Sequence, residues 1–398
     1  MLEGIRVVEL GVWVAGPGAG GVLADWGADV VKLEAPSGDP LRTMFRSVLG
    51  MGVDESPPFE LDNRGKRSVV LDLRTAAGRE VARRLVAEAD VFLTNLRPDA
   101  VERLGLGPEA VLADAPRLVY ASVTGFGREG PEAHRAGYDI GAFWARSGLA
   151  AAHTPAGADP LALRSGTGDH VTGLATVAGI LAALLRRERT GVGGLVETSL
   201  LRTGVYCLGW DLSIQLRFGK LAPAVPRHQV ANPVINAYPC GDGRWVWLLG
   251  LEGDRHWPRL VEALGRPALA DDARFVDARA RRHHAAELVA IVDAELARHD
   301  RDHWAARFDA AGLWWAPVNT PADVVVDPQA EAAGAFVDVP AGAGGPAHRG
   351  VATPVGFPDD AARPGAVPGL GEHTEAVLAE LGLGADAVAA LRSAGALG

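Results

Sequence analysis

The first 125 residues alternate short apolar runs with stretches of helical periodicity. Apolar runs predict five β-strands, at 5–10, 29–34, 68–73, 90–94 and 118–123. Apolar residues at helical spacing predict helices at 19–26 and at 75–89, the second capped by Thr75. Strands that are apolar throughout and alternate with helices are typical of a parallel sheet covered on both faces. Because ligands bind at the carboxyl ends of such strands, we expect function in the loops after residues 10, 34, 73, 94 and 123.

The pattern changes in the second half of the chain. A long apolar run predicts a helix over 171–187 that ends in a basic turn before Gly191, and 197–218 predicts another long helix. Beyond a proline-bearing linker, two apolar runs around Gly241-Asp242-Gly243 predict a hairpin of 234–239 with 244–249. Helical patterns follow from 254 to about 311, and again at 372–382 and 385–394. Residues 226–320 are thus predicted to form a smaller α+β domain.

Composition and charge narrow the class of protein. The 398 residues are 48% hydrophobic and 22% charged, as in soluble globular proteins of two or more domains. A net charge of −10 without a basic face disfavours nucleic acid as a partner. Cys207 and Cys240 give neither a disulfide framework nor a metal-binding spacing. The first residues lack signal-peptide features, and the apolar run 171–185 is shorter than the roughly 20 residues of a membrane span. We expect a cytoplasmic protein with no membrane partner.

Two motifs at predicted strand ends are candidates for anion binding. The run 16–21 (GPGAGG) has neither the spacing of the dinucleotide fingerprint nor the Lys-Ser/Thr of a P-loop, which favours a tight turn with close helix packing. Asn95 and Arg97 follow the fourth predicted strand, and Arg103 lies further along. These side chains could hold phosphate oxygens. They could equally belong to a helix entry, with Pro98 near the first turn and solvated arginines.

Asp169 lies in the motif GTGDH, directly before the apolar helix. Aspartate is a favoured N-cap, which is a structural explanation for it. The functional explanation uses the same place: Gly166 and Gly168 would admit a bulky substrate, and a helix N-terminus would keep the carboxylate ionised as a nucleophile. His170 could be an acid–base group, although a single histidine there is more often structural. The tryptophans, including Trp314 and Trp315, are expected in the core.

Longer segments of the chain resemble class III CoA-transferases, the family of formyl-CoA transferase and the carnitine CoA-transferases. The segments include LADWGADVVKLE, NRGKRSVVLDLRT, ADVFLTNLRPDAVERLG, PRLVYASVTGFG, GTGDHVTG, WAPVNTPADVVVDPQ and LGEHTEAVLAELGL. They cover nearly the whole chain, least well from about 205 to 300. In that family the aspartate of the glycine-rich motif is the catalytic nucleophile, and the matching residue here is Asp169. The resemblance therefore implies that Asp169 is both nucleophile and cap.

The resemblance also implies an architecture and a binding site. A Rossmann-like large domain of 1–225 would be completed by a return segment, 321–398, around the small domain 226–320, and two chains would interlock as a homodimer. CoA would contact Ala15, Leu71, Asp72, Leu73, Arg74, Asn95, Leu96, Arg97, Arg103 and Tyr138. Val14 and Ala35 replace a Gln and an Arg of formyl-CoA transferase, and 223–233 has no counterpart of its glycine-rich lid.

The implied reaction moves CoA from an acyl-CoA donor to a carboxylic acid through an aspartyl anhydride and an aspartyl-CoA thioester. It needs no permanently bound cofactor and no metal. The related α-methylacyl-CoA racemases are an alternative, but their H-D-I motif is Tyr138-Asp139-Ile140 here, and a phenol with a pKa of about 10 is a poor proton carrier at neutral pH. His134 or His170 would have to substitute for it. A non-catalytic CoA-binding protein is the second alternative.

Overall fold

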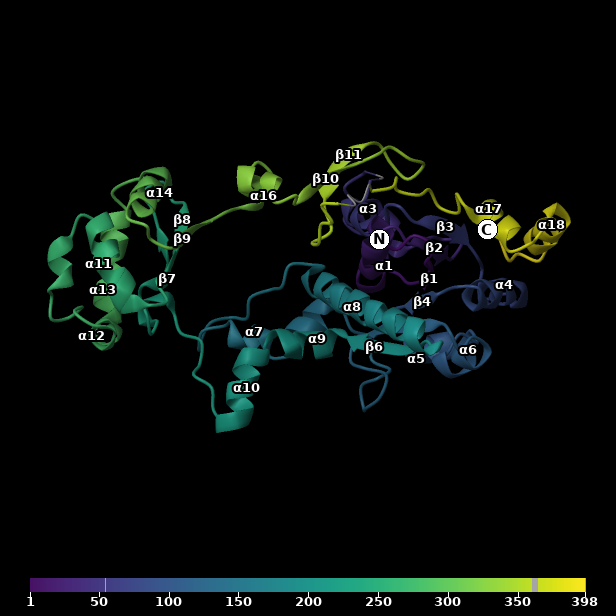
Figure 1. Cartoon of the computed structure of the whole chain (residues 1–398), viewed down its shortest axis with the longest axis horizontal. Coiled ribbons are helices and arrows are strands. Elements are labelled where there is room, and N and C mark those ends of the chain that lie inside the picture. Colours follow the sequence, from purple (N-terminus) through teal and green to yellow (C-terminus); the bar gives the residue numbers. More distant parts are fainter. Residues whose placement is uncertain (54, 360–363, 398) are drawn as a thin grey trace. The chain divides into compact units, whose positions relative to one another are not determined.

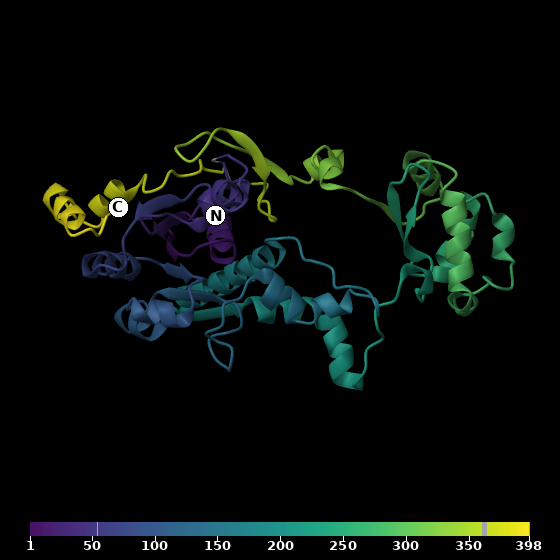
Figure 2. The same cartoon turned by 180° about the vertical axis from the view of Figure 1, so that it is seen from behind.

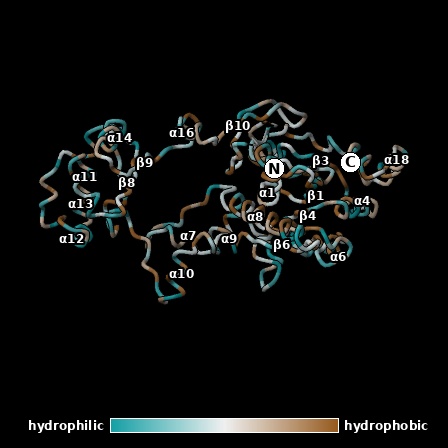
Figure 3. Tube along the Cα trace, viewed as in Figure 1, coloured by the Kyte–Doolittle hydropathy of each residue, from teal (hydrophilic) through white to brown (hydrophobic). Residues whose placement is uncertain are grey.

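The computed structural model describes residues 1–53, 55–359 and 364–397. The chain falls into two compact units (Figure 1). The first comprises Met1–Ala151, Leu161–Leu221 and Ala332–Gly398, and the second comprises Ala152–Pro160 and Ala222–Glu331. Hydrophobic and hydrophilic residues are interspersed along the trace of both units (Figure 3), and each unit encloses a hydrophobic core of its own.

A six-stranded sheet organises the first unit. Its strands are β1 (Arg6–Leu10), β2 (Asp29–Glu34), β3 (Arg67–Val70), β4 (Val91–Thr94), β5 (Val119–Thr124) and β6 (Gly194–Ser199). They are all parallel and lie in the order β3-β2-β1-β4-β5-β6. This is the strand order of the Rossmann fold. The predicted parallel α/β sheet is therefore confirmed.

The sixth strand corrects the prediction of one long helix over 197–218. β6 pairs with β5 along its whole length, and two helices follow it, α9 (Leu200–Cys207) and α10 (Gly209–Phe218). Ser199 separates strand from helix, because its hydroxyl accepts a 3.0 Å hydrogen bond from the Arg202 amide. Exposure alternates along β6, as expected for a half-covered edge strand, so its apolar residues do not form the unbroken run that marked the other strands.

Helices cover both faces of this sheet. The helices and helical turns of this part of the chain are α1 (Ala15–Asp25), η1 (Pro40–Thr43), α2 (Met44–Ser47), α3 (Pro57–Asn63), α4 (Ala76–Ala87), α5 (Pro98–Arg103), α6 (Pro108–Asp114), the π-helical η2 (Asp139–Ala145), α7 (Leu149–Ala152) and α8 (Thr167–Thr190). Successive strand residues point to opposite faces. Val7 and Val30 pack towards α1 and α8, whereas Val8 and Val31 pack towards α4 and α6. Thr75 caps α4 as predicted, accepting a 3.0 Å hydrogen bond from the Gly78 amide.

The glycine-rich run 16–21 lies inside α1, so the predicted tight turn is wrong. The helix begins at Ala15, directly after the loop that follows β1. The predicted close packing is confirmed. A Cβ on Gly20 would lie 1.9 Å from Glu9 Oε2, and one on Gly21 would lie 2.7 Å from the carbonyl oxygen of Asp62. These glycines let β1 and α3 approach the helix closely.

The apolar helix α8 is longer than predicted by about one turn at its N-terminal end. Gly191 ends it in a left-handed conformation, as expected. By length and composition alone, α8 is the one helix in the described part of the chain that could cross a membrane, and the core helix of a soluble protein meets the same criterion. Val177, Ile180 and Leu184 of α8 are buried in the core that it shares with α1 and the sheet.

The second unit is built on a small antiparallel sheet. The predicted hairpin is confirmed as β7 (Ile235–Pro239) with β8 (Trp245–Leu249), and β9 (Trp315–Val318), which was not predicted, pairs with β8. Its helical segments are η3 (Arg227–Gln229), α11 (Gly253–Ala263), η4 (Pro267–Ala270), α12 (Ala278–His283), α13 (Ala285–Leu296), α14 (Arg301–Ala310), α15 (Pro321–Val324) and α16 (Pro328–Ala332). Trp257 and Trp304 are buried in its core. Trp314 is half exposed, so its predicted core position is wrong.

The C-terminal segment returns to the first unit. It forms a two-stranded ribbon, β10 (Phe336–Val339) with β11 (His348–Val351), and then the two predicted helices, α17 (Thr374–Glu380) and α18 (Ala385–Ser393). Seen from behind in Figure 2, these yellow helices lie beside the purple N-terminal strands. The Thr374 hydroxyl accepts a 3.0 Å hydrogen bond from the Val70 amide, and the Ala396 carbonyl accepts one of 2.9 Å from the Asp72 amide.

Candidate active site

Asp169 is the third residue of α8, not its N-cap. Gly166 occupies the N-cap position with φ +82°, a left-handed conformation that favours glycine, and no side chain caps the helix. The predicted capping role of Asp169 is therefore wrong. Gly166, with no Cβ, lets the helix begin at Thr167, so the carboxylate projects from the first turn instead of bonding to it.

Two elements pack closely against the first two turns of α8. A Cβ on Gly168 would lie 2.6 Å from the Phe143 ring of η2, and one on Gly173 would lie 3.2 Å from the Ala15 carbonyl oxygen of α1. Gly168 thus permits a contact that a Cβ would block, and Gly173 permits one that a Cβ would make tight. The result is that Asp169, on the first of these turns, is half-buried.

Burial and neighbouring carboxylates change the charge state of Asp169. Desolvation, with smaller contributions from Asp139 and Asp62, raises the pKa of Asp169 to about 7, while His170 opposes the rise. Burial and the neighbouring carboxylates therefore oppose the ionised state that the helix N-terminus was expected to maintain. Asp139, at the start of η2, is buried, and its Oδ2 has no hydrogen-bond partner among the described residues.

The imidazole of His170 is hydrogen-bonded to the buried carboxylate of Asp62 on α3. Its Nε2 lies 2.9 Å from Oδ1 of Asp62, the side chain of which is only 3% exposed. This bond raises the pKa of His170. Burial raises the pKa of Asp62, and its Oδ2 has no hydrogen-bond partner in the part of the chain that the structure describes.

A second ionic cluster lies behind this one, entirely enclosed. Glu9 accepts hydrogen bonds from Lys32 Nζ (3.0 Å) and from Lys66 Nζ (2.7 Å), and all three side chains are fully buried. Lys32 also pairs with Asp39 at 3.0 Å, and Lys66 donates to Asn63 at 2.9 Å. The lysines lower the pKa of Glu9 in spite of its burial, and burial lowers the pKa of Lys66 to about 8. This cluster ties β1, β2 and α3 together.

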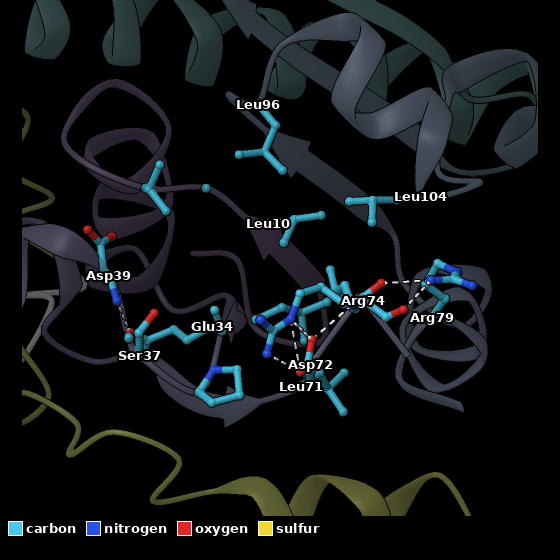
Figure 4. Close-up of a pocket in the computed structure, with 17 residues that line it drawn as sticks. Leu10, Glu34, Ser37, Asp39, Leu71, Asp72, Arg74, Arg79, Leu96 and Leu104 are labelled. Carbon is cyan, nitrogen blue, oxygen red and sulfur yellow. Dashed lines mark hydrogen bonds and ion pairs between the residues drawn. The ribbon is translucent and has the colours of Figure 1, made fainter. Parts of the chain in front are cut away.

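A cavity of about 670 Å³ opens at the carboxyl ends of β1, β2 and β3. Figure 4 shows Leu10, Leu96 and Leu104 on one side of it, with Arg79 and the paired Asp72 and Arg74 on another. Of the predicted CoA contacts, five line this cavity: Leu71, Asp72, Leu73, Arg74 and Leu96. The position agrees with the expectation for a parallel sheet.

The other five predicted contacts do not line the cavity. Asn95 fastens the loop after β1, because its side chain accepts from the Val12 amide (3.0 Å) and donates to the Val12 carbonyl (2.7 Å). Ala15 is buried at the start of α1, and Arg97 is the N-cap residue of α5. Arg103 pairs with Asp99 and lines a smaller hollow of about 340 Å³ together with Arg79, a residue common to both cavities. Tyr138 is 62% exposed.

The comparisons with known proteins identify the family. The model of the family described as CoA-transferase family III matches residues 2–374. The chain belongs to this family. It is 32% identical to (R)-2-hydroxy-4-methylpentanoate CoA-transferase of Clostridioides difficile, over 96% of each protein. It is 35% identical to succinate–glutarate CoA-transferase of Agrobacterium fabrum, over 96% of this chain and 95% of the relative. A family III chain with such relatives is an enzyme with CoA-transferase activity.

Solved structures agree with this membership. A protein of the CAIB/BAIF family from Brucella suis superimposes with a TM-score of 0.84 at 35% identity, covering 95% of this chain and 98% of that one. In the part of the chain that the structure describes, no group of three or more His, Cys, Asp or Glu side chains could hold a metal ion. The substrates of family III enzymes are CoA thioesters, so a site in this chain has to accept both a nucleotide and an acyl group.

The loop 11–14 after β1 runs from the cavity to the start of α8, and the sequence predicted it as one of five strand-end loops. Gly11 and Val12 line the cavity, and the same loop reaches α8, where Val14 Cγ1 lies 3.9 Å from the Cβ position of Gly166. Within the described residues, Trp13 is the one non-glycine with positive φ (+65°), and its ring packs edge-to-face on Tyr138 with centroids 6.2 Å apart. Nothing in the sequence indicates that the backbone at Trp13 has a positive φ. The sequence pointed to this loop only through the rule that ligands bind at the carboxyl ends of parallel strands.

Proposed function

We propose that this family III enzyme transfers CoA from an acyl-CoA donor to a carboxylic acid through covalent intermediates on Asp169. The supporting observation is a half-buried carboxylate on the first turn of α8, flanked by Gly166 and Gly168, whose pKa is raised to about 7. Such a carboxylate is poorly solvated when ionised, which favours nucleophilic attack.

The reaction balances without a metal, a redox partner or a net proton transfer. An Asp169 oxygen attacks the thioester carbon of the donor, the carbon–sulfur bond breaks, and CoA leaves as thiolate. The thiolate attacks Cγ of the resulting anhydride, releases the donor acid and forms an aspartyl-CoA thioester. The acceptor carboxylate attacks Cγ in turn, and the returning thiolate carries away the new acyl group as acyl-CoA. Asp169 is regenerated as a carboxylate.

Backbone amides at the start of α8 would stabilise the oxyanion of each tetrahedral intermediate. Two amides of the turn 166–170 are already used, since Thr167 donates to the Arg164 carbonyl (3.3 Å) and His170 to that of Gly166 (2.9 Å). The amides of Gly168 and Asp169 remain as donors at the open end of the helix. We place CoA in the cavity lined by Leu71, Asp72, Leu73, Arg74 and Leu96, with the arginines at its edge facing the phosphates.

We also propose that two chains form the interlocked homodimer implied by the family resemblance. Helices α9 and α10 expose large apolar side chains: Tyr206 (85%), Trp210 (83%), Leu216 (87%) and Phe218 (69%). A patch of this kind is typical of a protein interface. Light scattering on serial dilution should show no folded monomer, because interlocked chains cannot separate without unfolding. A folded monomer at low concentration would contradict this arrangement.

The experiment that tests the reaction traps CoA on Asp169. The enzyme is incubated with acetyl-CoA, succinyl-CoA, 4-methylpentanoyl-CoA or cinnamoyl-CoA without an acceptor, and is then treated with hydroxylamine. The Asp169 peptide should carry a hydroxamate with at least one donor, and Asp169→Asn should carry none. Absence of the hydroxamate together with absence of transfer to any acid tested would overturn the proposal.

The same donors in deuterated water test the racemase alternative. An α-methylacyl-CoA such as 2-methylbutanoyl-CoA should gain little deuterium at its α-carbon, because Tyr138 replaces the racemase histidine and a phenol holds its proton at neutral pH. Fast exchange with inversion would favour the racemase.

A further inference from the structure

His170 and Asp62 form a fixed pair directly beside the proposed nucleophile. Asp62 belongs to α3, more than 100 residues away in the chain, yet its Oδ1 lies 2.9 Å from His170 Nε2. The space for this bond comes from Gly18 of α1: a Cβ there would lie 3.3 Å from His170 Cδ2 and 3.5 Å from Asp62 Oδ1. Three separate elements thus contribute to holding one imidazole ring in place.

The charged groups around Asp169 come from three elements. Asp139 belongs to η2, Asp62 to α3, and His170 to α8 itself, and only His170 favours the ionised form of Asp169. Glu9 and Lys66 act on Asp62 from behind, with opposite signs. Because the ring is bonded to a carboxylate and faces two more, it gains a proton readily, and protonated it is the positive charge next to the nucleophile.

We propose that Asp62 and His170 are a positioning pair that keeps Asp169 ionised for attack on the thioester. Asp62 fixes the ring and holds it protonated, and the charge of the imidazolium offsets the repulsion from Asp139. No proton leaves the ring during the reaction, and neither residue forms a bond to the substrate. This inference rests on the proposed function, because it assigns His170 a task only if Asp169 attacks.

A purely structural pair would predict something different. If the bond between His170 and Asp62 only fastens α8 to α3, its loss would lower activity equally at every pH. If the pair instead keeps Asp169 ionised, the effect of losing it depends on pH. Activity should fall at pH values where Asp169 is partly protonated, and it should be unchanged at high pH, where Asp169 is ionised in any case.

The kinetic test is the pH profile of kcat/KM with the best donor of the panel. In the parent, kcat/KM should rise with pH through a midpoint near 7, the pKa of Asp169. His170→Gln should move this midpoint up by about one pH unit, the size typical of losing one nearby opposite charge. Asp62→Asn should move it up by less, because it weakens the charge on His170 but also removes a like charge that raises the pKa of Asp169. Asp139→Asn should move it down by a similar amount, because it removes a like charge. At pH 9 the His170→Gln rate should be within about threefold of the parent rate.

His153→Gln is the matched control, since His153 is an exposed histidine that is not among the groups acting on Asp169. Its profile should superimpose on that of the parent. A midpoint that stays in place in both His170→Gln and Asp62→Asn, or a loss of equal size at all pH values, would overturn the proposal.

A second readout does not depend on turnover. Titration of 15N-histidine-labelled protein by NMR, with the His170 signal assigned from its loss in His170→Gln, should give a pKa for His170 above the ordinary range. Asp62→Asn should lower that pKa by about one unit. An ordinary pKa in the parent would overturn the pair even if transfer is fast. If instead the NMR shift appears but no donor ever modifies Asp169, the proposed function has failed and the pair has no catalytic task.

Discussion

Two ionic clusters lie close together in the first unit, and they differ in how their charges are matched. Around Glu9, two lysines meet two carboxylates, those of Glu9 and Asp39, in fully buried ion pairs. Around Asp169, three carboxylates meet one histidine, and Oδ2 of Asp62 and Oδ2 of Asp139 have no hydrogen-bond partner among the described residues. Asp39 Oδ2 also makes no hydrogen bond, but it lies 3.0 Å from the Lys32 ammonium.

The difference separates a structural cluster from a reactive one. In the Glu9 cluster, the lysines offset the desolvation of Glu9, so its charge is retained and links β1, β2 and α3, although burial still lowers the pKa of Lys66 to about 8. In the Asp169 cluster, burial is not offset in this way: it raises the pKa of Asp169, with added repulsion from Asp139 and Asp62, and it also raises the pKa of Asp62. A carboxylate without a paired cation, such as Asp169, is more available for chemistry than a carboxylate held in a buried ion pair, such as Glu9.

The largest expected effect is the loss of catalysis in Asp169→Asn. Removing the nucleophile closes the covalent route, so transfer should fall by at least about 10³-fold. Rates are measured by following the product acyl-CoA by mass spectrometry, with deamidation of the introduced asparagine excluded. Asp386→Asn is the matched control, because Asp386 is an exposed aspartate in the first turn of another helix, α18. Near-normal transfer by a folded Asp169→Asn protein would mean that the Asp169 cluster is not the reactive one, and the two clusters would then not differ in function.

The matched cluster should respond in stability instead. Glu9→Gln leaves Lys32 and Lys66 without their shared carboxylate, and breaking one partner of a buried ion pair costs about 3–5 kcal/mol. Urea unfolding at pH 7.5 measures the change. A cost below about 1 kcal/mol would show that the lysines are not held by charge.

Asp169→Asn should also change stability, in the opposite direction and with pH. The pKa of Asp169 is about 7 in the folded protein and about 3.9 when unfolded, so folding becomes less favourable as pH rises between these values. Asparagine does not ionise and avoids this loss. We expect Asp169→Asn to be more stable than the parent at pH 8 by a few kcal/mol, since one pKa unit is worth about 1.4 kcal/mol. The difference should shrink at pH 5, and urea unfolding at the two pH values checks both statements.

The smallest effect is expected from Asp62→Asn on stability. The amide oxygen of the introduced asparagine can still accept the hydrogen bond from His170. Its amide nitrogen takes the place of Oδ2, which has no hydrogen-bond partner among the described residues. Its free energy of unfolding at pH 8 should stay within about 1 kcal/mol of the parent, because the loss of charge attraction is set against a smaller desolvation cost. A loss comparable to that of Glu9→Gln would mean that both clusters are structural.

The sequence predicted the parts of this molecule that depend on local pattern. Apolar runs located β1 to β5, and Thr75 located the start of α4, because burial of a whole strand and capping of a helix both involve neighbouring residues. β6 was missed because exposure alternates along it and leaves no unbroken apolar run, whereas β3, at the other edge of the sheet, is mostly buried and was predicted. The start of α1 was misplaced because glycine and proline usually end helices, whereas here Gly20 and Gly21 serve the packing of Glu9 and Asp62 against the helix.

In the candidate site, the sequence motif identified Asp169 but did not predict that its pKa is raised. Its pKa depends on Asp139 and Asp62, which lie 30 and 107 positions away in the chain, and no spacing rule brings them to α8. The cavity residues after β3 were predicted from the resemblance. Arg79 was not predicted, because it reaches the cavity from a helix, whereas residues 36–39 were predicted only as part of the loop after a strand end.

The return of the C-terminal segment also bears on how the chain is made. Val377 and Leu378 of α17, with Leu381 directly after it, share a core with Val31 and Val69 of the sheet, so the cover that α4 and α6 give to this face is completed only when residues near the C-terminus have been added. Residues 222–331 of the second unit are synthesised in between. At about 5–20 residues per second, a ribosome takes roughly 6 to 22 seconds over this segment. During that interval α4 and α6 can already pack on this face but α17 cannot, so Val31 and Val69 lack part of their final packing.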